Sequence, residues 1–439
     1  MRNLSFGVVA VGAMLLASGV SDHAATSPTT LAVAGRANAN VSLAASGSFV
    51  AAVWSASAPA GDTDAYAATS RDSGRTFSSP VRVNSVPGDA RVNGEQPPRL
   101  ALKERAGSTP EFVVVWTTKG SAGTKLLQAT STDGGRTFTA SALVPGSDAP
   151  GNRGWEAVGA GPGGRFFSVW LDHRKMAPPQ QVKMAGEYHH EGSATPATPA
   201  TPAASAAPPT DGVAMAQLSQ LYVTSLDGVV APKGVTGGVC YCCKTAIAAG
   251  PGNSLFLAWR HVYAGNLRDI AFAASRDGGK TFAPPVRVSE DKWQIEGCPD
   301  DGPSMGVDAS GAVHIVWPSV VTEKSGPVKA LFYATTRDGR SFSPRLRLPT
   351  EGQANHPQQA IDTAGSLAVG WDESGSGSRT LASALGRPDA TGAMQFTRTA
   401  EAREVGTYPV LVSVRPGGWL RAWTTGDPSR SEIRVASIN

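Results

Sequence analysis

The sequence predicts an all-β protein built from a repeated hairpin. The motif Ser-x-Asp-x-Gly-x-Thr-Phe occurs at 70–77, 131–138 and 275–282, with a shortened copy at 336–342 and a partial copy at 225–228. Each copy lies between short apolar runs, so we expect a tight turn in which Asp caps backbone N–H groups and Gly supplies a positive φ. Recurrence of one hairpin indicates a repeat architecture. The 50 glycines, 32 prolines and 17% charged residues agree with many short strands joined by turns.

A second period counts the repeats. Apolar, alternating runs end in tryptophan seven times, which favours seven units. These tryptophans are Trp54, Trp116, Trp170, Trp259, Trp317, Trp371 and Trp423. Their intervals are similar, except for a much longer one between the third and the fourth. That interval contains residues 176–215, a Pro/Ala/Thr-rich stretch that cannot build a core and is expected to be a flexible insertion.

The last unit lacks a strand of its own. After the Trp423 run, only residues 433–438 can form one more strand before the chain stops. The segment 30–33 precedes the first unit and could add the missing strand. We expect it to close the ring, because an unpaired edge strand would otherwise be exposed.

The repeated motif is the Asp-box, and the chain resembles the sialidase-like (BNR/Asp-box repeat) β-propeller superfamily over most of its length. The resemblance implies a single β-propeller domain of four-stranded blades over 28–439, with seven blades favoured and six as the alternative. It also implies that the Asp-box is a structural turn away from the ligand face. The residues concerned are Asp72, Asp133, Asp277 and Asp338.

Residues 1–25 have the features of a secretory signal peptide. Arg2 precedes an apolar stretch at 6–17, and small residues follow. The apolar stretch is too short for a stable membrane anchor, so we expect an exported protein, periplasmic or secreted, in which disulfides are permitted. The net charge is +4 without a concentrated basic run, and nucleic-acid binding is therefore not indicated.

We expect the cysteines to lie at one opening of the central channel of the predicted ring, which we call its mouth. In a propeller, the starts of the inner strands and the ends of the Trp-containing strands converge on one face. Cys240 precedes Trp259 by the same interval as Cys298 precedes Trp317, so both cysteines occupy the same register in adjacent blades. Three of the four cysteines lie at 240–243.

Two interpretations of the cysteines remain open. The first is a disulfide between Cys240 and Cys298, with a vicinal or free pair at Cys242 and Cys243. The second is a soft-metal site, since clustered thiolates favour Cu(I) or Zn²⁺ and His356, also placed near the mouth, could add an imidazole. Copper is the ion considered for this site because thiolates are soft ligands. The spacing of the cysteines, which differs from the paired CxxC of structural zinc sites, counts against a metal site.

A hydrolase would need other residues. The resemblance implies arginines that hold a substrate carboxylate, an acid/base carboxylate and a tyrosine nucleophile. The family's Arg-Ile-Pro signature is absent from 38–43, which reads Asn-Ala-Asn-Val-Ser-Leu. The catalytic candidates are Arg260, Tyr408, Asp172 and Glu156, and the ligand-binding candidates are Arg174, His261, Asp300 and Asp301.

Three functions follow from these residues. The favoured one is an exported binding propeller whose cysteine-rich mouth binds copper or performs thiol redox chemistry. The alternative is an exo-α-sialidase or related glycoside hydrolase acting on a terminal acidic sugar. The third is a non-catalytic scaffold that binds protein or glycan. The expected ligand is accordingly a metal ion or a glycan.

Overall fold

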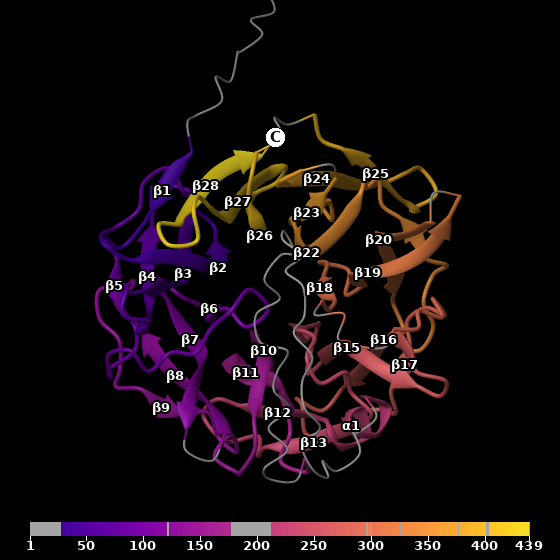
Figure 1. Cartoon of the computed structure of the whole chain (residues 1–439), viewed down its shortest axis with the longest axis horizontal. Coiled ribbons are helices and arrows are strands. Elements are labelled where there is room, and N and C mark those ends of the chain that lie inside the picture. The colour runs from indigo at the N-terminus through magenta and orange to yellow at the C-terminus, as the bar shows by residue number, and fades with distance from the viewer. Residues whose placement is uncertain are drawn as a thin grey trace, which may run out of the picture.

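The computed structural model is a ring of seven antiparallel sheets, each of four strands (Figure 1). It describes residues 28–438, apart from 121–122, 177–211, 296, 298, 300, 325, 376 and 401–403. The predicted signal peptide, most of the predicted insertion, Cys298 and Asp300 therefore lie outside the described residues. The seven-bladed prediction is confirmed and the six-bladed alternative is wrong, because each tryptophan run belongs to a complete sheet.

The blades follow one another around the ring in chain order, as the colour gradient of Figure 1 shows. The first three, from the axis outward, are β2 (Ala37–Ser46), β3 (Phe49–Ser57), β4 (Thr63–Ser70), β5 (Val81–Arg82); β6 (Arg99–Arg105), β7 (Ser108–Gly120), β8 (Gly123–Ser131), β9 (Ala142–Leu143); and β10 (Arg153–Gly161), β11 (Arg165–Asp172), β12 (Gln220–Ser225), β13 (Lys233–Gly237). A 3-10 turn, η1 (Pro162–Gly164), joins β10 to β11, and α1 (Gly212–Leu218) precedes β12.

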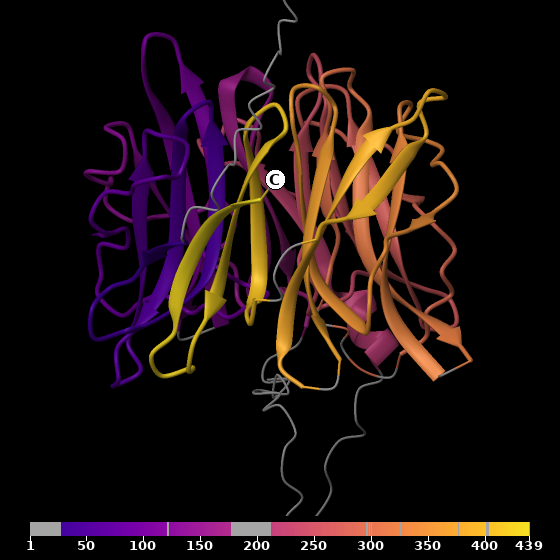
Figure 2. The same cartoon turned by 90° about the horizontal axis from the view of Figure 1, so that it is seen from above.

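The next three blades have the same order. They are β14 (Ala246–Ala249), β15 (Leu255–Tyr263), β16 (Leu267–Ser275), β17 (Val286–Arg287); β18 (Ser304–Val307), β19 (Val313–Glu323), β20 (Gly326–Thr336), β21 (Leu346–Arg347); and β22 (Gln353–Ile361), β23 (Leu367–Ser374), β24 (Arg379–Pro388), β25 (Met394–Arg398). Figure 2 shows the ring from its edge, with the inner strands running along the axis. Among the described helices, none is long and apolar enough to cross a membrane.

The seventh blade joins the two ends of the chain. It consists of β26 (Thr407–Arg415), β27 (Gly418–Thr425), β28 (Glu432–Ile438) and β1 (Thr29–Leu31). β1 pairs antiparallel with β28, with Thr29 opposite Val435. The N-terminal strand thus covers the edge that β28 would expose, as predicted from the missing strand.

The tryptophans of the seven runs form the core between blades. All seven side chains are buried, and several of their indole N–H groups bind polar residues near the strand ends. Trp170 donates to Asp172 at 3.0 Å, and Trp371 donates to Glu373 at 2.9 Å. A buried indole usually has such an acceptor, so the tryptophan runs also position polar side chains at one face of the ring.

The Asp-box hairpins have the expected internal hydrogen bonds. The Asp277 carboxylate accepts from the Thr281 backbone N–H at 2.8 Å and from the Ser275 hydroxyl at 2.8 Å. Gly279 has a φ of +84°, and its N–H donates to the Ser275 hydroxyl. All these contacts stay within one turn, which accounts for the motif without a ligand.

Candidate functional site

One face of the ring, here called the mouth, collects the starts of the inner strands and the ends of the tryptophan strands. In the first blade Ala39 pairs with Ser55, directly after Trp54. The same antiparallel register recurs around the ring. The Asp-box turns connect strands at the other face, so the side chains able to contact a ligand at the mouth are those that the tryptophan spacing selects.

Backbone bulges orient several of the mouth residues. Four inner strands shift register near the mouth, and each carries a non-glycine residue with positive φ. These residues are Asn40, Trp155, His356 and Tyr408, with φ between 51° and 60°. Such conformations are uncommon for non-glycine residues and re-aim the side chain. A recurrent strained position on one face is typical of a binding surface.

The three cysteines at 240–243 form a buried sulfur cluster between β13 and β14. The Sγ atoms of Cys240 and Cys243 are 3.2 Å apart, and those of Cys240 and Cys242 are 3.7 Å apart. All three sulfurs lie within 4.8 Å of one another. They pack in the interior with Trp155 and Trp259, so they are shielded from bulk solvent.

Their oxidation states differ. Cys240 and Cys243 are free thiols, whereas Cys242 is disulfide-bonded. The predicted disulfide between Cys240 and Cys298 is therefore wrong, and so is a vicinal bridge between Cys242 and Cys243. Equal spacing from the tryptophans predicted Cys240 as the bonded residue, whereas the disulfide involves Cys242, two residues later in the chain.

The surroundings of the two free thiols favour one thiolate. The Cys243 thiol donates a hydrogen bond to the Cys240 sulfur, and this bond, with Arg268 and Arg260 nearby, lowers the pKa of Cys240 to about 6 although burial opposes it. Arg268 Nη1 lies 3.3 Å from the same sulfur. Burial and the neighbouring Cys240 raise the pKa of Cys243 well above its ordinary value. At neutral pH the pair is one thiolate and one thiol.

His356 does not join the sulfur cluster. Among the described residues, the only group of three or more potential metal ligands within reach of one another consists of the three cysteines. His356 instead binds Asp372 through Nδ1 at 2.6 Å, and its ring stacks on Tyr408 with the centroids 3.9 Å apart. Its Nε2 lies 3.7 Å from Glu95 Oε1. The structure thus assembles a second polar group at the mouth.

Asp301 connects the two groups. Its carboxylate accepts from the His356 backbone N–H at 3.0 Å and pairs with Lys329 at 3.2 Å and Lys244 at 3.9 Å. Burial would raise the pKa of Asp301, but Lys329 and Lys244 outweigh it and lower the pKa to about 2. Because Lys244 directly follows Cys243, the cysteine turn also places a cation beside this carboxylate.

The arginines selected from sequence are engaged by the protein itself. Arg260 is buried, and its guanidinium donates to the carbonyl oxygens of Asp301, Arg268 and Pro318 at 2.6 to 3.1 Å. Arg174 donates a hydrogen bond to Asp172 at 2.8 Å, and its guanidinium lies over the ring of Tyr222. Neither guanidinium fork is presented to a ligand carboxylate.

Three other candidates have structural contacts or are shielded by burial. Asp172 is buried and accepts from Arg153 as well as from Arg174 and Trp170. Burial lowers the pKa of His261 to about 4, so this residue is neutral at pH 7. Burial also raises the pKa of Glu156 to about 7, and its Oε1 has no hydrogen-bond partner among the described residues.

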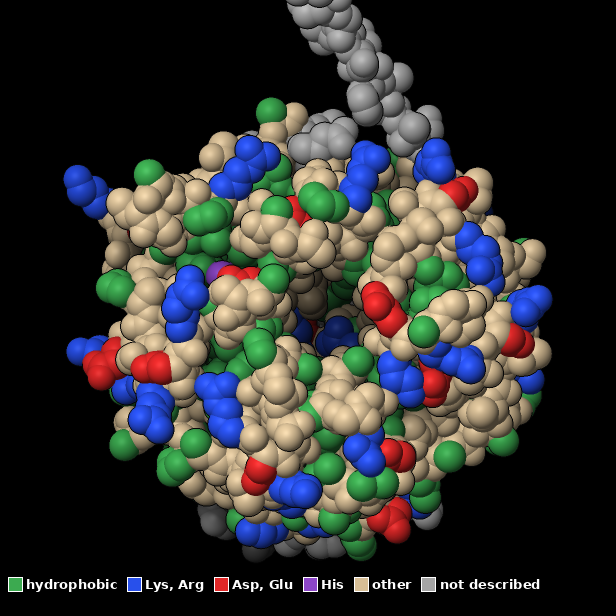
Figure 3. Space-filling model, turned by 180° about the vertical axis from the view of Figure 1, so that it is seen from behind, with side chains coloured by type: hydrophobic (Ala, Val, Ile, Leu, Met, Phe, Trp, Pro, Cys, Tyr) green, Lys and Arg blue, Asp and Glu red, His purple; other side chains and the backbone are tan. Residues whose placement is uncertain are grey.

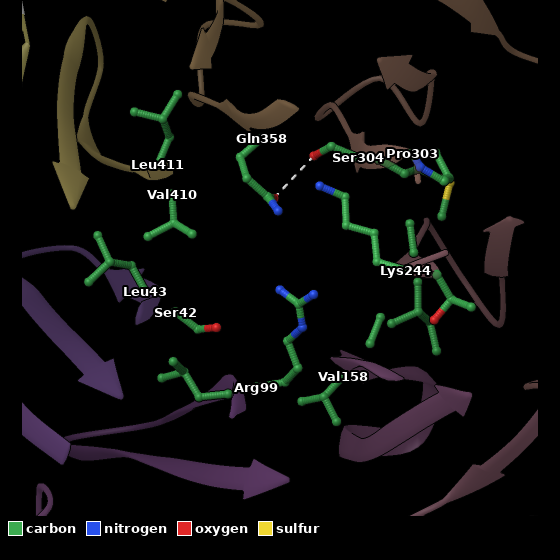
Figure 4. A pocket seen from close by; sticks show the side chains of 16 residues that line it. Ser42, Leu43, Arg99, Val158, Lys244, Pro303, Ser304, Gln358, Val410 and Leu411 are labelled. Carbon is green, nitrogen blue, oxygen red and sulfur yellow. Dashed lines mark hydrogen bonds between the residues drawn. The ribbon is translucent and has the colours of Figure 1, made fainter. Parts of the chain in front are cut away.

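Sequence reasoning missed Arg99, Lys244 and Gln358, which point into the axial channel (Figure 4). Arg99 and Lys244 precede Trp116 and Trp259 by similar intervals, so the tryptophan spacing already places them near the starts of inner strands. Basic residues at such positions belong to no motif, and this spacing is the one signal in the sequence that could have identified them.

Comparison with known proteins shows the fold. No family model and no curated protein sequence matches the chain. Among solved structures, it is similar to the GH93 α-L-arabinofuranosidase of Fusarium graminearum with 11% identity, 94% and 98% of the two chains covered and a TM-score of 0.50. A PL25 ulvan lyase has 9% identity, coverage of 93% and 95% and a TM-score of 0.52. A Hadza microbial sialidase, Hz136, has 13% identity, coverage of 86% and 73% and a TM-score of 0.44. The chain therefore has a β-propeller fold with seven four-stranded blades, and its overall arrangement is similar to those of the arabinofuranosidase and the lyase.

Proposed function

We propose that this chain is an exported binding propeller whose cysteine cluster works as a thiol–disulfide switch. The observation that carries the proposal is the 3.7 Å separation between the sulfur of Cys240, a thiolate, and that of Cys242, which is disulfide-bonded. A thiolate in contact with a disulfide sulfur is the reactant pair of thiol–disulfide exchange. Export is consistent with the apolar N-terminal stretch and with a disulfide in the protein.

The exchange step needs no external oxidant. The Cys240 sulfur forms a bond to the Cys242 sulfur, and the existing disulfide bond breaks. The electron pair of the broken bond leaves on the sulfur of the former partner, which takes up a proton according to its pKa. Arg268 stabilises the starting thiolate, so its positive charge favours the form in which Cys242 keeps its original partner.

Burial defines what kind of switch this can be. Cys240 is 0% exposed and Cys243 is 1% exposed, so a folded protein substrate cannot reach either sulfur. The exchange is therefore internal, and its consequence is a change in the turn at 240–243. Lys244 follows this turn and pairs with Asp301, which transmits the change to the mouth.

A soft-metal site is the second candidate. Three cysteine sulfurs within 4.8 Å of one another suit Cu(I), because clustered thiolates are the soft ligands that this ion prefers. The disulfide at Cys242 would have to be reduced before this sulfur could contribute a thiolate. Metal binding and disulfide formation at Cys242 therefore exclude each other.

One experiment separates the two candidates. Protein from the exported fraction is alkylated under denaturing conditions, its disulfides are mapped by mass spectrometry, and copper and zinc are measured. The switch predicts a mixture of two pairings of Cys242 that shifts under limiting reductant, and Cys240→Ser should retain only one pairing. Four reduced cysteines with stoichiometric copper would contradict the switch and support the metal site. A single disulfide pairing that limiting reductant never rearranges would also contradict the switch.

The hydrolase and scaffold interpretations have less support. A sialidase needs arginine forks that face the substrate, whereas Arg260 and Arg174 donate to protein acceptors. A plain scaffold does not explain a thiolate held against a disulfide. If the wild type hydrolyses a fluorogenic sialoside and Tyr408→Phe does not, the hydrolase interpretation would be supported instead.

A further inference from the structure

Two cations face one cavity inside the axial channel. The cavity has a volume of about 160 Å³ and is bounded by inner strands of the ring. Figure 4 shows the side chains of Arg99, Lys244 and Gln358 converging on its centre. None of the residues that line it is Asp or Glu. A cavity with cationic and amide donors and no lining carboxylate is suited to an anion.

Arg99 has hydrogen-bond donors that no described protein group uses. Its Nε donates to the backbone oxygen of Glu156 at 3.1 Å. Within the described part of the chain, no hydrogen bond to a protein group is formed by its two terminal nitrogens, and these point into the cavity (Figure 4). Burial lowers the pKa of Arg99, yet a guanidinium remains charged in proteins. The fork is therefore a partly buried cation whose terminal nitrogens have no hydrogen-bond acceptor among the described residues.

Lys244 and Gln358 extend this donor set. Lys244 Nζ donates to the Pro357 oxygen at 3.1 Å and approaches Asp301 only to 3.9 Å, while Lys329 pairs with the same carboxylate at 3.2 Å. An ammonium has three donors, so Lys244 keeps donors for a ligand. The Gln358 oxygen faces Ser304 at 3.5 Å, and the amide nitrogen is turned toward the cavity (Figure 4).

The carboxylates that interact with these cations lie outside the cavity. Glu156 and Glu95 act on Arg99, and Asp301 acts on Lys244, but none of the three lines it. Glu95 lines a smaller neighbouring cavity, which Arg99, Lys244 and Gln358 also line from its other side. Figure 3 shows the face opposite to that of Figure 1, where a central hollow has Lys or Arg side chains at its floor. Solvent thus reaches basic groups inside the ring.

We propose that the axial channel binds a small oxyanion, a carboxylate or a sulfate group, through Arg99, Lys244 and Gln358. The guanidinium fork matches two oxygens of such a group, and the ammonium adds a point charge. A volume of about 160 Å³ holds one such group and a few waters. No cysteine lines this cavity, and Lys244, which follows the cysteine turn, is the one residue that the anion site shares with the proposed switch.

Binding can be measured through the melting temperature, because a ligand that binds only the folded state stabilises it. Sodium sulfate and sodium glucuronate are titrated against sodium chloride at equal ionic strength, with glucose as the neutral control. We expect a saturable increase with sulfate, glucuronate or both. Arg99→Gln should weaken the apparent affinity at least tenfold, and Lys244→Gln should weaken it less. The matched control Arg337→Gln removes an exposed arginine and should bind like the wild type.

The two anions distinguish an inorganic ligand from a carboxylate ligand. The proposal is overturned if neither anion gives a saturable effect, or if Arg99→Gln binds as the wild type does. A second measurement covers the case in which Arg99→Gln does not fold. In the wild-type protein, phenylglyoxal should modify Arg99, and the anion that raises the melting temperature should protect it. Modification of Arg99 at the same rate with and without that anion would also overturn the proposal.

Discussion

The thiol of Cys243 donates a hydrogen bond to the sulfur of Cys240 across 3.2 Å, and this contact makes two neighbouring cysteines chemically unequal. It is the largest cause that lowers the pKa of Cys240 to about 6. The other causes that lower it are the cations Arg268 and Arg260. Their side chains are themselves held by protein acceptors, so the thiolate has a fixed electrostatic environment.

Cys243→Ala should raise the pKa of Cys240 toward the ordinary thiol value of about 8.5, because it removes the strongest donor and leaves the cations. Ultraviolet thiolate absorbance measured against pH reports this shift. The wild type should show a transition near the pKa of about 6, and Cys240→Ala should lack it. An unchanged transition in Cys243→Ala would show that the arginines alone set the pKa.

Glu156→Gln should change the pH dependence of stability. Burial raises the pKa of Glu156 from 4.5 to about 7 in the folded state. The folded protein therefore prefers the neutral acid, and stability is lost as pH rises from about 4.5 through about 7. The loss at pH 8 is on the order of 3 kcal/mol. The amide does not ionise, so this part of the decline should disappear.

Denaturant unfolding at pH 5 and pH 8 tests this expectation. The difference in unfolding free energy between the two pH values should be smaller in Glu156→Gln than in the wild type. Glu290→Gln changes an exposed carboxylate and should follow the wild type. Equal pH dependence in all three proteins would mean that Glu156 is solvated or paired in solution.

Asp133→Asn should weaken one Asp-box turn. Burial opposes the shift, but hydrogen bonds from Thr137, Ser131 and Arg136 outweigh it and lower the pKa of Asp133 to about 2. The stabilisation by this carboxylate is present above about pH 4 and lost as pH falls toward 2. The exposed turn limits the cost to about 1 kcal/mol or less. Urea unfolding at pH 7 and pH 3 should show a smaller difference between variant and wild type at pH 3.

Removal of β1 should open the ring. Truncation before Val33, which deletes β1, leaves the edge of β28 unpaired, whereas truncation before Pro28 retains it. We expect the shorter chain to lose roughly 1–3 kcal/mol, from a few ladder hydrogen bonds and the burial of Leu31, and to associate more readily. Thermal unfolding and sedimentation compare the two truncations. Equal behaviour would show that closure through β1 is dispensable.

Much of the architecture was predictable because its signals are local. Each apolar run that ends in tryptophan forms one buried strand of one blade, so seven runs predict seven blades. The missing strand after Trp423 predicts closure by the N-terminal segment. Residues after a tryptophan were expected at the mouth, and the antiparallel register of each hairpin places them there. Periodicity reports which face of a strand is buried.

The chemistry of the site depended on contacts between distant segments. The sequence showed that Cys240, Cys242 and Cys243 are neighbours in the chain, but only the folded turn shows the Cys240 sulfur, free and buried, beside those of Cys242 and Cys243. Arg260 has a plausible position for substrate binding, yet three carbonyl oxygens occupy its donors.

The sequence by itself determined the number of blades, the closing strand and the clustering of three cysteines, because repeats and spacing follow from the chain alone. The tertiary structure decided which thiol is ionised, which arginine is engaged and which cations share a cavity. Arg99 and Lys244 lie in different blades, far apart in the chain. They meet only because ring closure brings inner strands around one axis, and electrostatic interaction depends on distance in space rather than in sequence.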